Sequence, residues 1–518
     1  MCSPNPIIAL FSISLLGVAV QASGDTGVQP APVRGSLVQS RPALLLSISA
    51  ADFAAVLQTT DAGRQLLQVA GTPKCGIDVF KLQYHTVGGA GEPTTASGAL
   101  MVPTGNDVAC HGERPIVLYA HGTQLNQNFD IGEIEDIDNN DEGTSIAAVF
   151  AAQGNLVVAP NYAGYDTSAL GYHPYLNTEQ QSKDTMDSLA AARWAMTLGV
   201  APNVRDSGEL FITGFSEGGL VAMATHRALQ RLGIPVTASA PLSGPYAISA
   251  YADAQFAGRV DYLAPLELTL VIDSYQHAYG NIYSAPTDIV QTRYADSLDL
   301  LPTNDLNVFS QGELPILQAF ASVPPAPQFA SVTPATIPAD IAPLFALGFG
   351  PNHLVTNAYR LRYLLDSLAN PDGGWPTITT GLPAAEPVNT LRQAFKLNDM
   401  RNWSPRAPLM MCGGTGDLNF MNALLMQNYW DSVGAEAPIS VLDLDSPPAP
   451  VGDPYASLKN GFAATKVSIA TNAVAQGATD GGTLAVLESY HAVIEELYCI
   501  PAARVFFEHH RRVIQGGS

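Results

Sequence analysis

Hydrophobic and polar residues alternate with two periods along residues 115–243. Short apolar runs, typical of strands buried on both faces, are separated by segments whose apolar residues recur at helical spacing. One such segment, 179–198, predicts an amphipathic helix with Leu189 and Trp194 on its inward face. Strands that alternate with helices favour an α/β fold with a mostly parallel central sheet and helices on both faces. Buried strands are predicted at residues 115–120, 156–160, 210–213 and 236–242.

A different pattern precedes this region. Residues 79–86 alternate between apolar and polar, and residues 99–102 are apolar, which predicts opening antiparallel strands. Apolar residues at helical spacing predict one amphipathic helix within residues 49–69. The Pro and Gly residues of segment 23–45 are typical of a linker, so the ordered core is expected to start at about residue 46.

The alternation of strands and helices stops near Tyr246. It resumes with an apolar strand at 407–412, a helix at 420–433 and a strand at 439–444. The intervening segment is rich in Ala, Leu, Pro and aromatic residues, and a chain of 518 residues exceeds what one core usually supports. We therefore predict a largely helical inserted cap. The predicted divisions are the cap at 246–400 and the two core parts at 46–245 and 401–518.

The cap sequence is apolar between its prolines, as in residues 313–320 and 341–347, and it shows no cluster of acidic or basic residues. Its insertion point follows a strand whose C-terminal end is expected at the mouth of the crevice. We therefore expect the cap to form an apolar roof over the crevice and to select the substrate. The alternative is that this apolar face is the core of the cap itself, which would leave the pocket polar and shallow.

The first residues are typical of a secretory signal peptide, predicted over residues 1–22. Residues 1–21 contain no charged side chain, and the apolar stretch 7–20 is too short to span a bilayer. Val20 and Ala22 then form a small-x-small cleavage site. A membrane anchor or an unprocessed tail is the alternative. The favoured interpretation places the mature protein in a secreted or periplasmic location, with no integral membrane segment.

The charge balance is strongly acidic, with 46 Asp and Glu against 24 Lys and Arg and a formal net charge of -22. Such a charge repels phosphate backbones and argues against nucleic-acid binding. The densest acidic run, 130–142, resembles an alternating Asp/Asn calcium loop. It lacks the glycine and the bidentate glutamate that an EF-hand requires. A solvated loop at the crevice rim is expected, with a weak calcium site as the alternative.

Candidate chemistry centres on residues 209–227, which predict a strand, a tight turn and a helix. Residues 214–218, GFSEG, match the G-x-S-x-G nucleophile elbow. A serine raised on so sharp a turn needs neighbours without a Cβ two positions before and after it, so that strand and helix can pass closely. Ser216 is therefore predicted as a nucleophile, and an ordinary glycine-rich turn is the alternative.

A second loop follows the strand at 115–120 with the sequence His121-Gly122-Thr123. A glycine just past a strand end lets backbone N–H groups point into the adjacent crevice, as an oxyanion hole requires. The N–H groups of Thr123 and Glu217 are the expected donors. His121 is interpreted as a structural residue that holds the loop, in preference to a general base.

HGT after one strand, GFSEGG after another, GTGDLNF after a late strand and SYHAV near residue 491 together resemble an α/β-hydrolase. The chain is most similar to the secreted bacterial lipase/esterase group that includes the secretory lipases, from about residue 46 onward. In that family the acid follows the strand after the cap and the histidine lies on a late loop before the last helix. The resemblance implies Asp417 and His491 for these positions.

The order Ser, Asp, His along the chain also fits this fold. A serine hydroxyl needs an imidazole within hydrogen-bond reach and a carboxylate that fixes the ring's tautomer. His491 combines a late position with the start of a predicted final helix at 492–512. Asp417 is preferred for the acid because of its GTGD turn, with Asp443 and Asp445 as alternatives.

Four cysteines remain after the predicted signal peptide, and none forms a C-x-x-C motif. An even number in an oxidising compartment favours disulfides, and four cysteines allow three pairings. Cys75 and Cys110 flank the opening strands. Cys412 ends the strand whose loop should approach the His491 helix, which bears Cys499. We predict Cys75 paired with Cys110 and Cys412 with Cys499.

These features predict a secreted serine esterase or lipase that cleaves a hydrophobic ester through an acyl-enzyme, without a metal or another cofactor. A serine peptidase on the same fold, of the aminopeptidase or dipeptidyl peptidase type, is the alternative. An inactive binding or adhesion protein is a third possibility, but it would rarely keep serine, acid and histidine together. Fold alone does not separate the first two. Acyl chain length, the natural substrate and the oligomeric state have no signal in the sequence.

Overall fold

A computed structural model describes residues 32–135, 137 and 140–516. The predicted signal peptide and most of the predicted linker lie outside these residues. Within them, nine strands form one sheet in the order β1-β2-β3-β5-β4-β6-β7-β8-β9. The first three strands and the β3–β5 pair are antiparallel, and the strands from β5 through β4 to β9 are parallel. The strand bounds are β1 Ala43–Ile48, β2 Gly76–Val87, β3 Pro93–Thr104, β4 Gly112–Ala120, β5 Leu156–Pro160, β6 Val204–Phe215, β7 Ala238–Leu242, β8 Leu409–Gly413 and β9 Ile439–Asp443.

The sheet is buried on both faces, as the continuous apolar strands predicted. In β4, Val117 and Tyr119 pack into one hydrophobic cluster, while Ile116 and Leu118 pack into another on the opposite face. The first cluster is closed by α1, α2, α3 and α15, and the second by α4 and α5. These helices span α1 Ala50–Leu57, α2 Asp61–Ala70, α3 Asp141–Val149, α4 Thr178–Thr197, α5 Glu217–Arg231 and α15 Glu496–Gly516.

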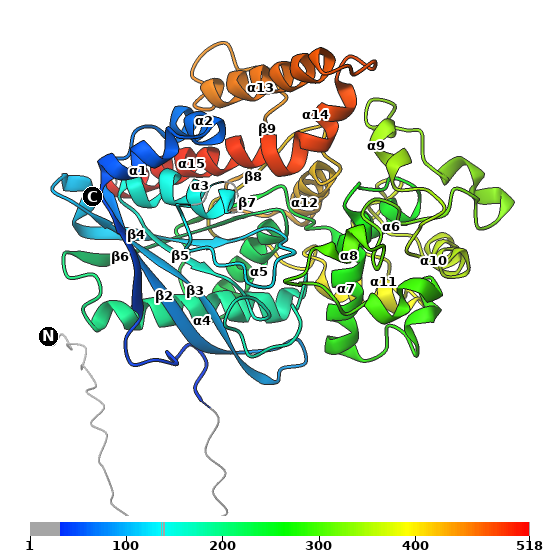
Figure 1. The fold of residues 1–518 in the computed structure, drawn as a ribbon, viewed down its shortest axis with the longest axis horizontal. Coiled ribbons are helices and arrows are strands. Elements are labelled where there is room, and N and C mark those ends of the chain that lie inside the picture. The colour runs from blue at the N-terminus through cyan, green and yellow to red at the C-terminus, as the bar shows by residue number, and fades with distance from the viewer. Residues whose placement is uncertain (1–31, 136, 138–139, 517–518) are drawn as a thin grey trace, which may run out of the picture. The chain divides into compact units, whose positions relative to one another are not determined.

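The segment between β7 and β8 leaves the sheet and forms a helical region with its own buried residues. Figure 1 shows α6 to α11 gathered beyond one end of the strands. We call residues 243–408 the cap. Its helices are α6 Ile248–Phe256, α7 Ala264–Tyr279, α8 Asn307–Ser310, α9 Ala342–Leu347, α10 Asn357–Ala369 and α11 Thr390–Asn398. After β8 follow α12 Phe420–Val433, α13 Ala456–Ala475 and α14 Thr483–Ser489, and a π-helical turn, Tyr490–Glu495, joins α14 to α15.

Three local predictions are wrong. Strand β1 begins at Ala43, inside the predicted linker, and Leu37 of the same segment already forms an isolated bridge with Tyr84 on β2. The single helix expected within residues 49–69 is two helices, because the Thr60 side chain accepts a hydrogen bond from the Gly63 N–H and starts a new one. Trp194 on α4 is 57% exposed, although its place in the helical pattern predicted an inward position.

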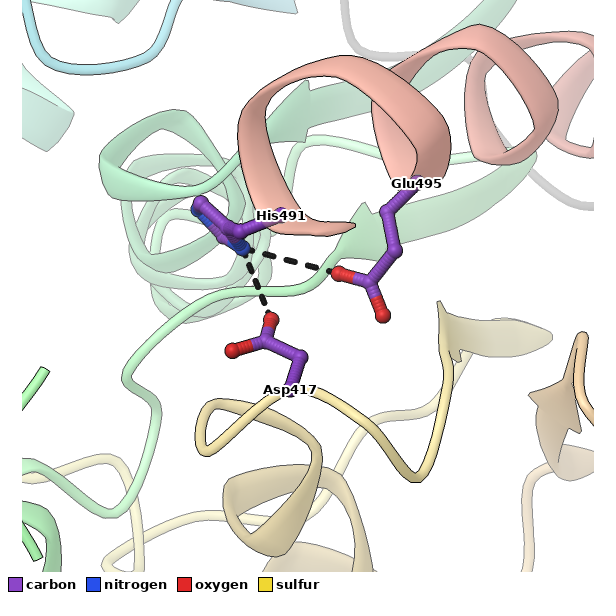
Figure 2. Close-up of side chains that lie close together, drawn as sticks. All are labelled: Asp417, His491 and Glu495. Atoms are coloured by element: carbon purple, nitrogen blue, oxygen red, sulfur yellow. Dashed lines mark hydrogen bonds and ion pairs between the residues drawn. The ribbon is translucent and has the colours of Figure 1, made fainter. Parts of the chain in front are cut away.

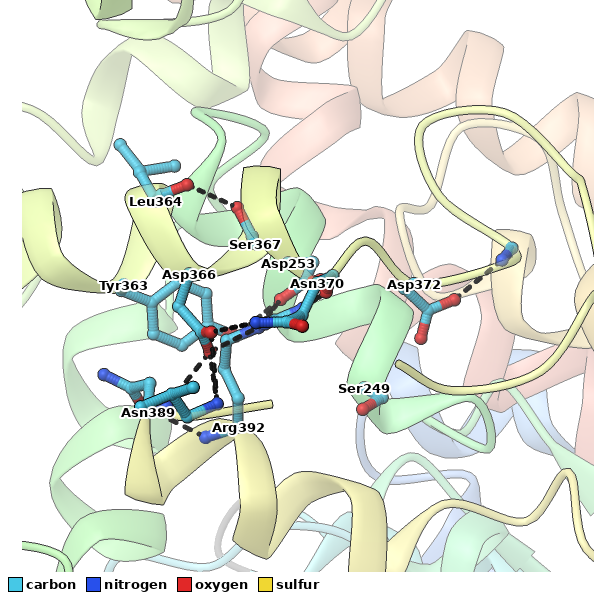
Figure 3. Close-up of polar contacts among 12 residues, drawn as sticks. Ser249, Asp253, Tyr363, Leu364, Asp366, Ser367, Asn370, Asp372, Asn389 and Arg392 are labelled. Carbon is cyan, nitrogen blue, oxygen red and sulfur yellow. Dashed lines mark hydrogen bonds and ion pairs between the residues drawn. The ribbon is translucent and has the colours of Figure 1, made fainter. Parts of the chain in front are cut away.

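The cap core contains buried ion pairs as well as apolar side chains. Arg392 on α11 lies 2.8 Å from Asp253 on α6 and 2.8 Å from Asp366 on α10, which joins three cap helices (Figure 3). A second buried arginine, Arg401, lies 2.7 Å from Asp372. These groups are almost fully buried, so a charge left without its partner would strongly destabilise the folded state.

Both predicted disulfides are present. Cys75 is bonded to Cys110 across the opening strands, with Cα atoms 5.5 Å apart. Cys412 in β8 is bonded to Cys499 in α15, with Cα atoms 5.7 Å apart. The second bond ties the strand that precedes the predicted acid to the helix that follows the predicted histidine.

Candidate active site

Ser216 sits on a sharp turn between β6 and α5, as the elbow pattern predicted. Its φ of 57° and ψ of -120° lie outside the regions that side-chain-bearing residues usually adopt. A Cβ at Gly214 or at Gly218 would collide with the carbonyl oxygen of Ala120 on β4. The two glycines therefore allow the turn to pass close to the neighbouring strand and to present the Ser216 hydroxyl.

The structure brings together the three predicted triad residues. His491 Nε2 lies 2.8 Å from Ser216 Oγ, and His491 Nδ1 lies 2.7 Å from Asp417 Oδ2. Burial opposes ionisation of Asp417, but the adjacent His491 outweighs it and lowers the pKa of the Asp417 carboxyl to about 2. Burial opposes charging of His491 as well, but the Asp417 carboxyl group and, after it, the Glu495 carboxyl group outweigh burial, and together they raise the pKa of the imidazole well above its usual value. Serine, imidazole and carboxylate thus form one hydrogen-bonded chain.

The alternative acids lie elsewhere. Asp445 contacts the Tyr490 hydroxyl and the Lys466 ammonium group, and Asp443 accepts a hydrogen bond of 2.9 Å from the Asp445 N–H. His491 itself lies in the π-helical turn, and not on a loop before the helix as the resemblance implied. π-Helical turns are often found at functional sites, because the extra residue changes the direction of nearby side chains.

Two residues close to Asp417, Ser243 and Glu495, were not predicted from the sequence as part of the site. Ser243, directly after β7, has its Oγ 2.7 Å from Asp417 Oδ2 and 2.6 Å from Glu495 Oε2. Glu495 Oε2 also lies 3.5 Å from His491 Nδ1, as Figure 2 shows. No motif marks either residue. The spacing of four between His491 and Glu495 was the one available signal, since it places both on the same side of a helix.

The predicted oxyanion loop borders the same pocket as Ser216. The Gly122 N–H is occupied, because both Glu142 carboxylate oxygens lie 3.0 Å from it. Thr123 comes next along the chain and lines the pocket, and its Oγ1 lies 2.9 Å from the Tyr175 hydroxyl. Glu217 is the first residue of α5, where backbone N–H groups have no partner within the helix. Thr123 and Glu217 remain proposed donors.

Two buried polar groups support these loops. His121 is fully buried and its ring nitrogens lie 2.6 Å from Gly122 O and 3.2 Å from Asn161 O. Burial lowers the pKa of His121 to about 4. The imidazole that contacts the Ser216 hydroxyl is that of His491, whereas the His121 ring contacts backbone carbonyl groups. The Glu217 side chain is buried, with its Oε1 2.7 Å from His173 Nε2, and it accepts a hydrogen bond of 2.6 Å from the Gln181 side chain.

The pocket at Ser216 has a volume of about 200 Å³. The cap supplies Leu263, directly before α7, and Leu266 and Glu267 on α7, so the expectation of a cap roof without acidic groups is wrong in part. Burial raises the pKa of Glu142 and of Glu267 to about 8, because a carboxylate in this wall would lose its hydration. The side chains that line the pocket at Ser216 include apolar ones, from Leu125, Phe215, Leu263, Leu266 and Ala492, and acidic ones, from Asp141, Glu142, Glu267 and Glu496.

A larger cavity of about 580 Å³ lies within the cap, and its lining includes none of the triad residues. Its walls combine the Arg259 guanidinium, stacked 4.3 Å from the Trp375 ring, with apolar side chains. Of these two cavities, the smaller one is the candidate active site, because Ser216, His491 and Thr123 line it.

The acidic run 130–142 is not a uniformly solvated loop. Ile131 and Ile134 are fully buried, and Asp130 Oδ2 lies 3.0 Å from Lys81 Nζ. The Asn140 side chain accepts a hydrogen bond of 3.0 Å from the Gly143 N–H and thereby caps α3. Asp136 lies outside the described residues, so the calcium alternative remains a prediction.

A mostly parallel sheet covered on both faces, with a serine elbow after β6, an acid after β8 and a histidine beyond β9, defines the α/β-hydrolase fold. Solved structures share it. The rice cell wall degrading esterase LipA from Xanthomonas oryzae is 24% identical over 80% of this chain and 91% of that chain, with a TM-score of 0.61. A Legionella pneumophila protein is 20% identical over 79% of this chain and 91% of its own, with a TM-score of 0.56. No protein-family model and no curated protein sequence matches the chain.

The described residues also bear on location. None of their helices is both long and apolar enough to cross a membrane. The two disulfides are compatible with an extracellular or periplasmic protein.

Proposed function

We propose that this protein is a serine hydrolase that cleaves carboxylic esters through an acyl-enzyme. The observation that carries the proposal is the continuous hydrogen-bonded chain from Ser216 Oγ through His491 to Asp417, placed at a pocket. This geometry can activate a serine hydroxyl at neutral pH. The shared fold with an esterase supports ester chemistry.

The reaction follows from the positions of these atoms. Ser216 Oγ attacks the ester carbonyl carbon while His491 Nε2 takes the hydroxyl proton, and Asp417 stabilises the resulting imidazolium. The oxyanion accepts hydrogen bonds from the N–H groups of Thr123 and Glu217. The bond to the leaving oxygen then breaks, and His491 returns its proton to that oxygen. A water molecule releases the acid from Ser216 by the same steps.

Pocket size favours short acyl groups. About 200 Å³ is less than the roughly 300–1,000 Å³ of pockets that enclose drug-sized ligands. The apolar side chains of Leu263 and Leu266 face this space, and each buried methylene of the substrate contributes about 0.8 kcal/mol. We infer that acetate to butyrate esters are preferred over palmitate esters, and that α7 of the cap sets this limit.

One observation favours the peptidase alternative. Glu267 and Glu496 line the pocket, and a carboxyl group could bind the free amine of a peptide substrate. However, burial raises the pKa of Glu267 to about 8 and that of Glu496 well above its usual range, which favours their neutral forms at neutral pH. Neutral carboxyl groups attract an ammonium group weakly. The ester-hydrolase hypothesis therefore has stronger support than the peptidase hypothesis.

A substrate panel tests the proposal. Purified protein is assayed with nitrophenyl esters from acetate to palmitate and, in parallel, with aminoacyl and dipeptidyl amides. We expect hydrolysis of the short esters, loss of this activity in Ser216→Ala, and little turnover of amides. Faster amide than ester hydrolysis would establish the peptidase instead.

We also propose that the protein is exported, with cleavage after Ala22. The uncharged apolar start of the sequence and the two disulfides support this location. N-terminal sequencing of protein recovered outside the cytoplasm should begin at Ser23, and recovery of a chain that still begins at Met1 would contradict cleavage.

A further inference from the structure

Ser243 and Glu495 surround the acid end of the triad. Ser243 has a φ of 42°, in the left-handed region, and its N–H donates to Cys412 O at 2.8 Å, so the serine is fixed at the end of β7. Glu495 is fully buried and comes from the same π-helical turn as His491. Figure 2 shows the Asp417 and Glu495 carboxyl groups converging on the His491 ring.

The Ser243 hydroxyl lies between the carboxyl groups of Asp417 and Glu495, and the number of protons available limits how the three can be hydrogen-bonded. Ser243 Oγ is 2.7 Å from Asp417 Oδ2 and 2.6 Å from Glu495 Oε2, and both are hydrogen-bond distances. A hydroxyl has one proton and can donate only once. If Ser243 donates to one carboxyl group, its short contact with the other is a hydrogen bond only when that carboxyl group carries a proton and donates it to Ser243.

The surroundings decide which carboxyl holds that proton. Asp417 faces the ring nitrogen of His491 at 2.7 Å and accepts from the Asn419 N–H at 2.9 Å, and both contacts favour the carboxylate. Glu495 has fewer contacts that would stabilise a negative charge. Its Oε1 is buried without a hydrogen-bond partner, and its Oε2 lies 3.5 Å from His491 Nδ1. A carboxylate so poorly solvated is unfavourable, so the proton belongs to Glu495.

We propose that Glu495 and Ser243 are positioning residues of the triad, in which a protonated Glu495 donates to Ser243 and Ser243 donates to Asp417. The inference rests on the proposed function and deepens it. Burial, together with the nearby Asp417 charge, raises the pKa of Glu495 well above its usual range, in agreement with this arrangement.

This arrangement keeps a single negative charge beside His491. With both carboxyl groups ionised, two negative charges would hold the imidazole in its protonated form, and a protonated His491 cannot accept the proton of Ser216. A neutral Glu495 therefore leaves His491 available as a base. The hydrogen bond from Ser243 also orients Asp417 toward the ring.

Other ionisable groups face this network. Tyr246 and Tyr490 lie near Glu495, and their own pKa values are raised by burial, so they stay neutral at working pH. Asp261 and Glu267 of the cap and Glu496 of α15 also act electrostatically on His491, and burial raises the pKa of all three acids. Of the two carboxyl groups that contact Ser243, Asp417 carries the negative charge and Glu495 carries a proton.

The inference is tested by the rate at which a fluorophosphonate labels Ser216, measured from about pH 5 to about pH 9. This reagent reports on the activated hydroxyl and needs no natural substrate. Glu495→Gln keeps a neutral group with N–H donors, Glu495→Met keeps the volume without a donor, and Ser243→Ala removes the link. Glu488→Gln, an exposed carboxyl on α14, is the control.

We expect Glu495→Gln to label within about threefold of the wild type, with the acid limb of its pH profile unchanged. Glu495→Met and Ser243→Ala should each slow labelling by about tenfold. Because Glu495 acts through Ser243, the double variant Glu495→Met/Ser243→Ala should be no slower than the slower single variant. Circular dichroism confirms that each variant is folded before its rate is compared.

Three outcomes would overturn the inference. A loss of about a hundredfold in Glu495→Gln, with the acid limb moved to lower pH, would show that Glu495 is ionised and serves as a second acid. Additive losses in the double variant would show that the two residues act separately. Wild-type rates in every variant would show that neither positions the triad. Absence of labelling in the wild type would instead defeat the proposed function itself.

Discussion

Buried carboxyl groups occur in two regions of this molecule and are compensated differently. In the cap, Asp253 and Asp366 share the guanidinium of Arg392, and Asp372 pairs with Arg401, all at 2.7–2.8 Å. Around Ser216, no Arg or Lys of the described residues lies within ion-pair distance of Glu142, Glu267 or Glu495. The cap arginines provide a full positive charge, whereas the site offers hydroxyl groups, backbone N–H groups and one imidazole.

The difference shows that the partner, and not the acid, decides the role of a buried carboxyl group. In the cap, burial raises the pKa of Asp253 and Asp372, but the hydrogen bonds and charges of Arg392 and Arg401 oppose that rise, and the paired carboxylates contribute to cap geometry. A carboxyl group without a cation keeps a raised pKa and can hold or share a proton, which catalysis can use. We therefore expect cap substitutions to affect folding and site substitutions to affect turnover.

The largest expected effect concerns the site. Ser216→Ala should lower kcat by at least about 10³-fold, and His491→Ala comparably, because triad members act as a unit. Asp417→Asn should be somewhat less severe. Steady-state kinetics on a short nitrophenyl ester measures the loss, and thermal unfolding should show Ser216→Ala still folded. Near wild-type rates in Ser216→Ala would reject the assignment.

The next effect concerns the cap. Arg392→Met should lower the free energy of unfolding by about 3–5 kcal/mol, because Asp253 and Asp366 would remain buried without a cation. Arg193→Met removes a partly exposed pair with Asp206 and should cost at most about 1 kcal/mol. Urea denaturation measures both. If Arg392→Met were as stable as Arg193→Met, the two regions would not differ as described.

Much of the site could be predicted from the sequence, because its chemistry imposes local patterns. The glycines around Ser216 follow from the close approach of β4, and Asp417 and His491 stand in recognisable contexts along the chain. Ser243 and Glu495 could not be found in this way. Each is a single residue that acquires its role only where β7, β8 and the π-helical turn meet.

The wrong assignment of Trp194 has a similar cause. The polar face of α4 is buried because its acids find distant partners: Asp184 accepts from the Tyr84 hydroxyl at 2.7 Å, and Asp187 from Arg34 at 2.9 Å. Arg34 lies in the segment predicted as a linker. Hydrophobic periodicity cannot reveal a polar face that is buried by such partners, so it placed the indole inward.

A third prediction concerns the disulfide between the two halves of the site. Replacing Cys412 and Cys499 by Ala should cost about 2–4 kcal/mol of stability and also lower turnover per folded molecule, because the bond connects the acid strand to the histidine helix. The matched change at Cys75 and Cys110 should cost stability alone. Activity titrated against fluorophosphonate-reactive sites separates these effects. Equal turnover in the two double variants would contradict the proposed coupling.

The smallest expected effect is a pH dependence. Folded Glu267 keeps its proton up to about pH 8, whereas an unfolded glutamate loses it near its ordinary pKa. Its contribution to stability is therefore fully present at low pH and is lost as the pH rises toward about 8. Glu267→Gln should flatten this decline in denaturation curves recorded at several pH values, while Glu113→Gln, an exposed site on β4, should leave it unchanged. A steeper decline in Glu267→Gln would reverse the assigned sign.

The wide spacing of the catalytic groups along the chain also determines when activity can arise during synthesis. Ser216 and His491 are separated by 275 positions, and the whole cap lies between them. A ribosome makes the nucleophile first and the base much later, so a nascent chain carries an inert serine for most of its production. An interrupted product that ends before His491 would hold a nucleophile without a base. The proposed ester cleavage would thus be confined to chains that have been made past that histidine and have then brought it back to the elbow.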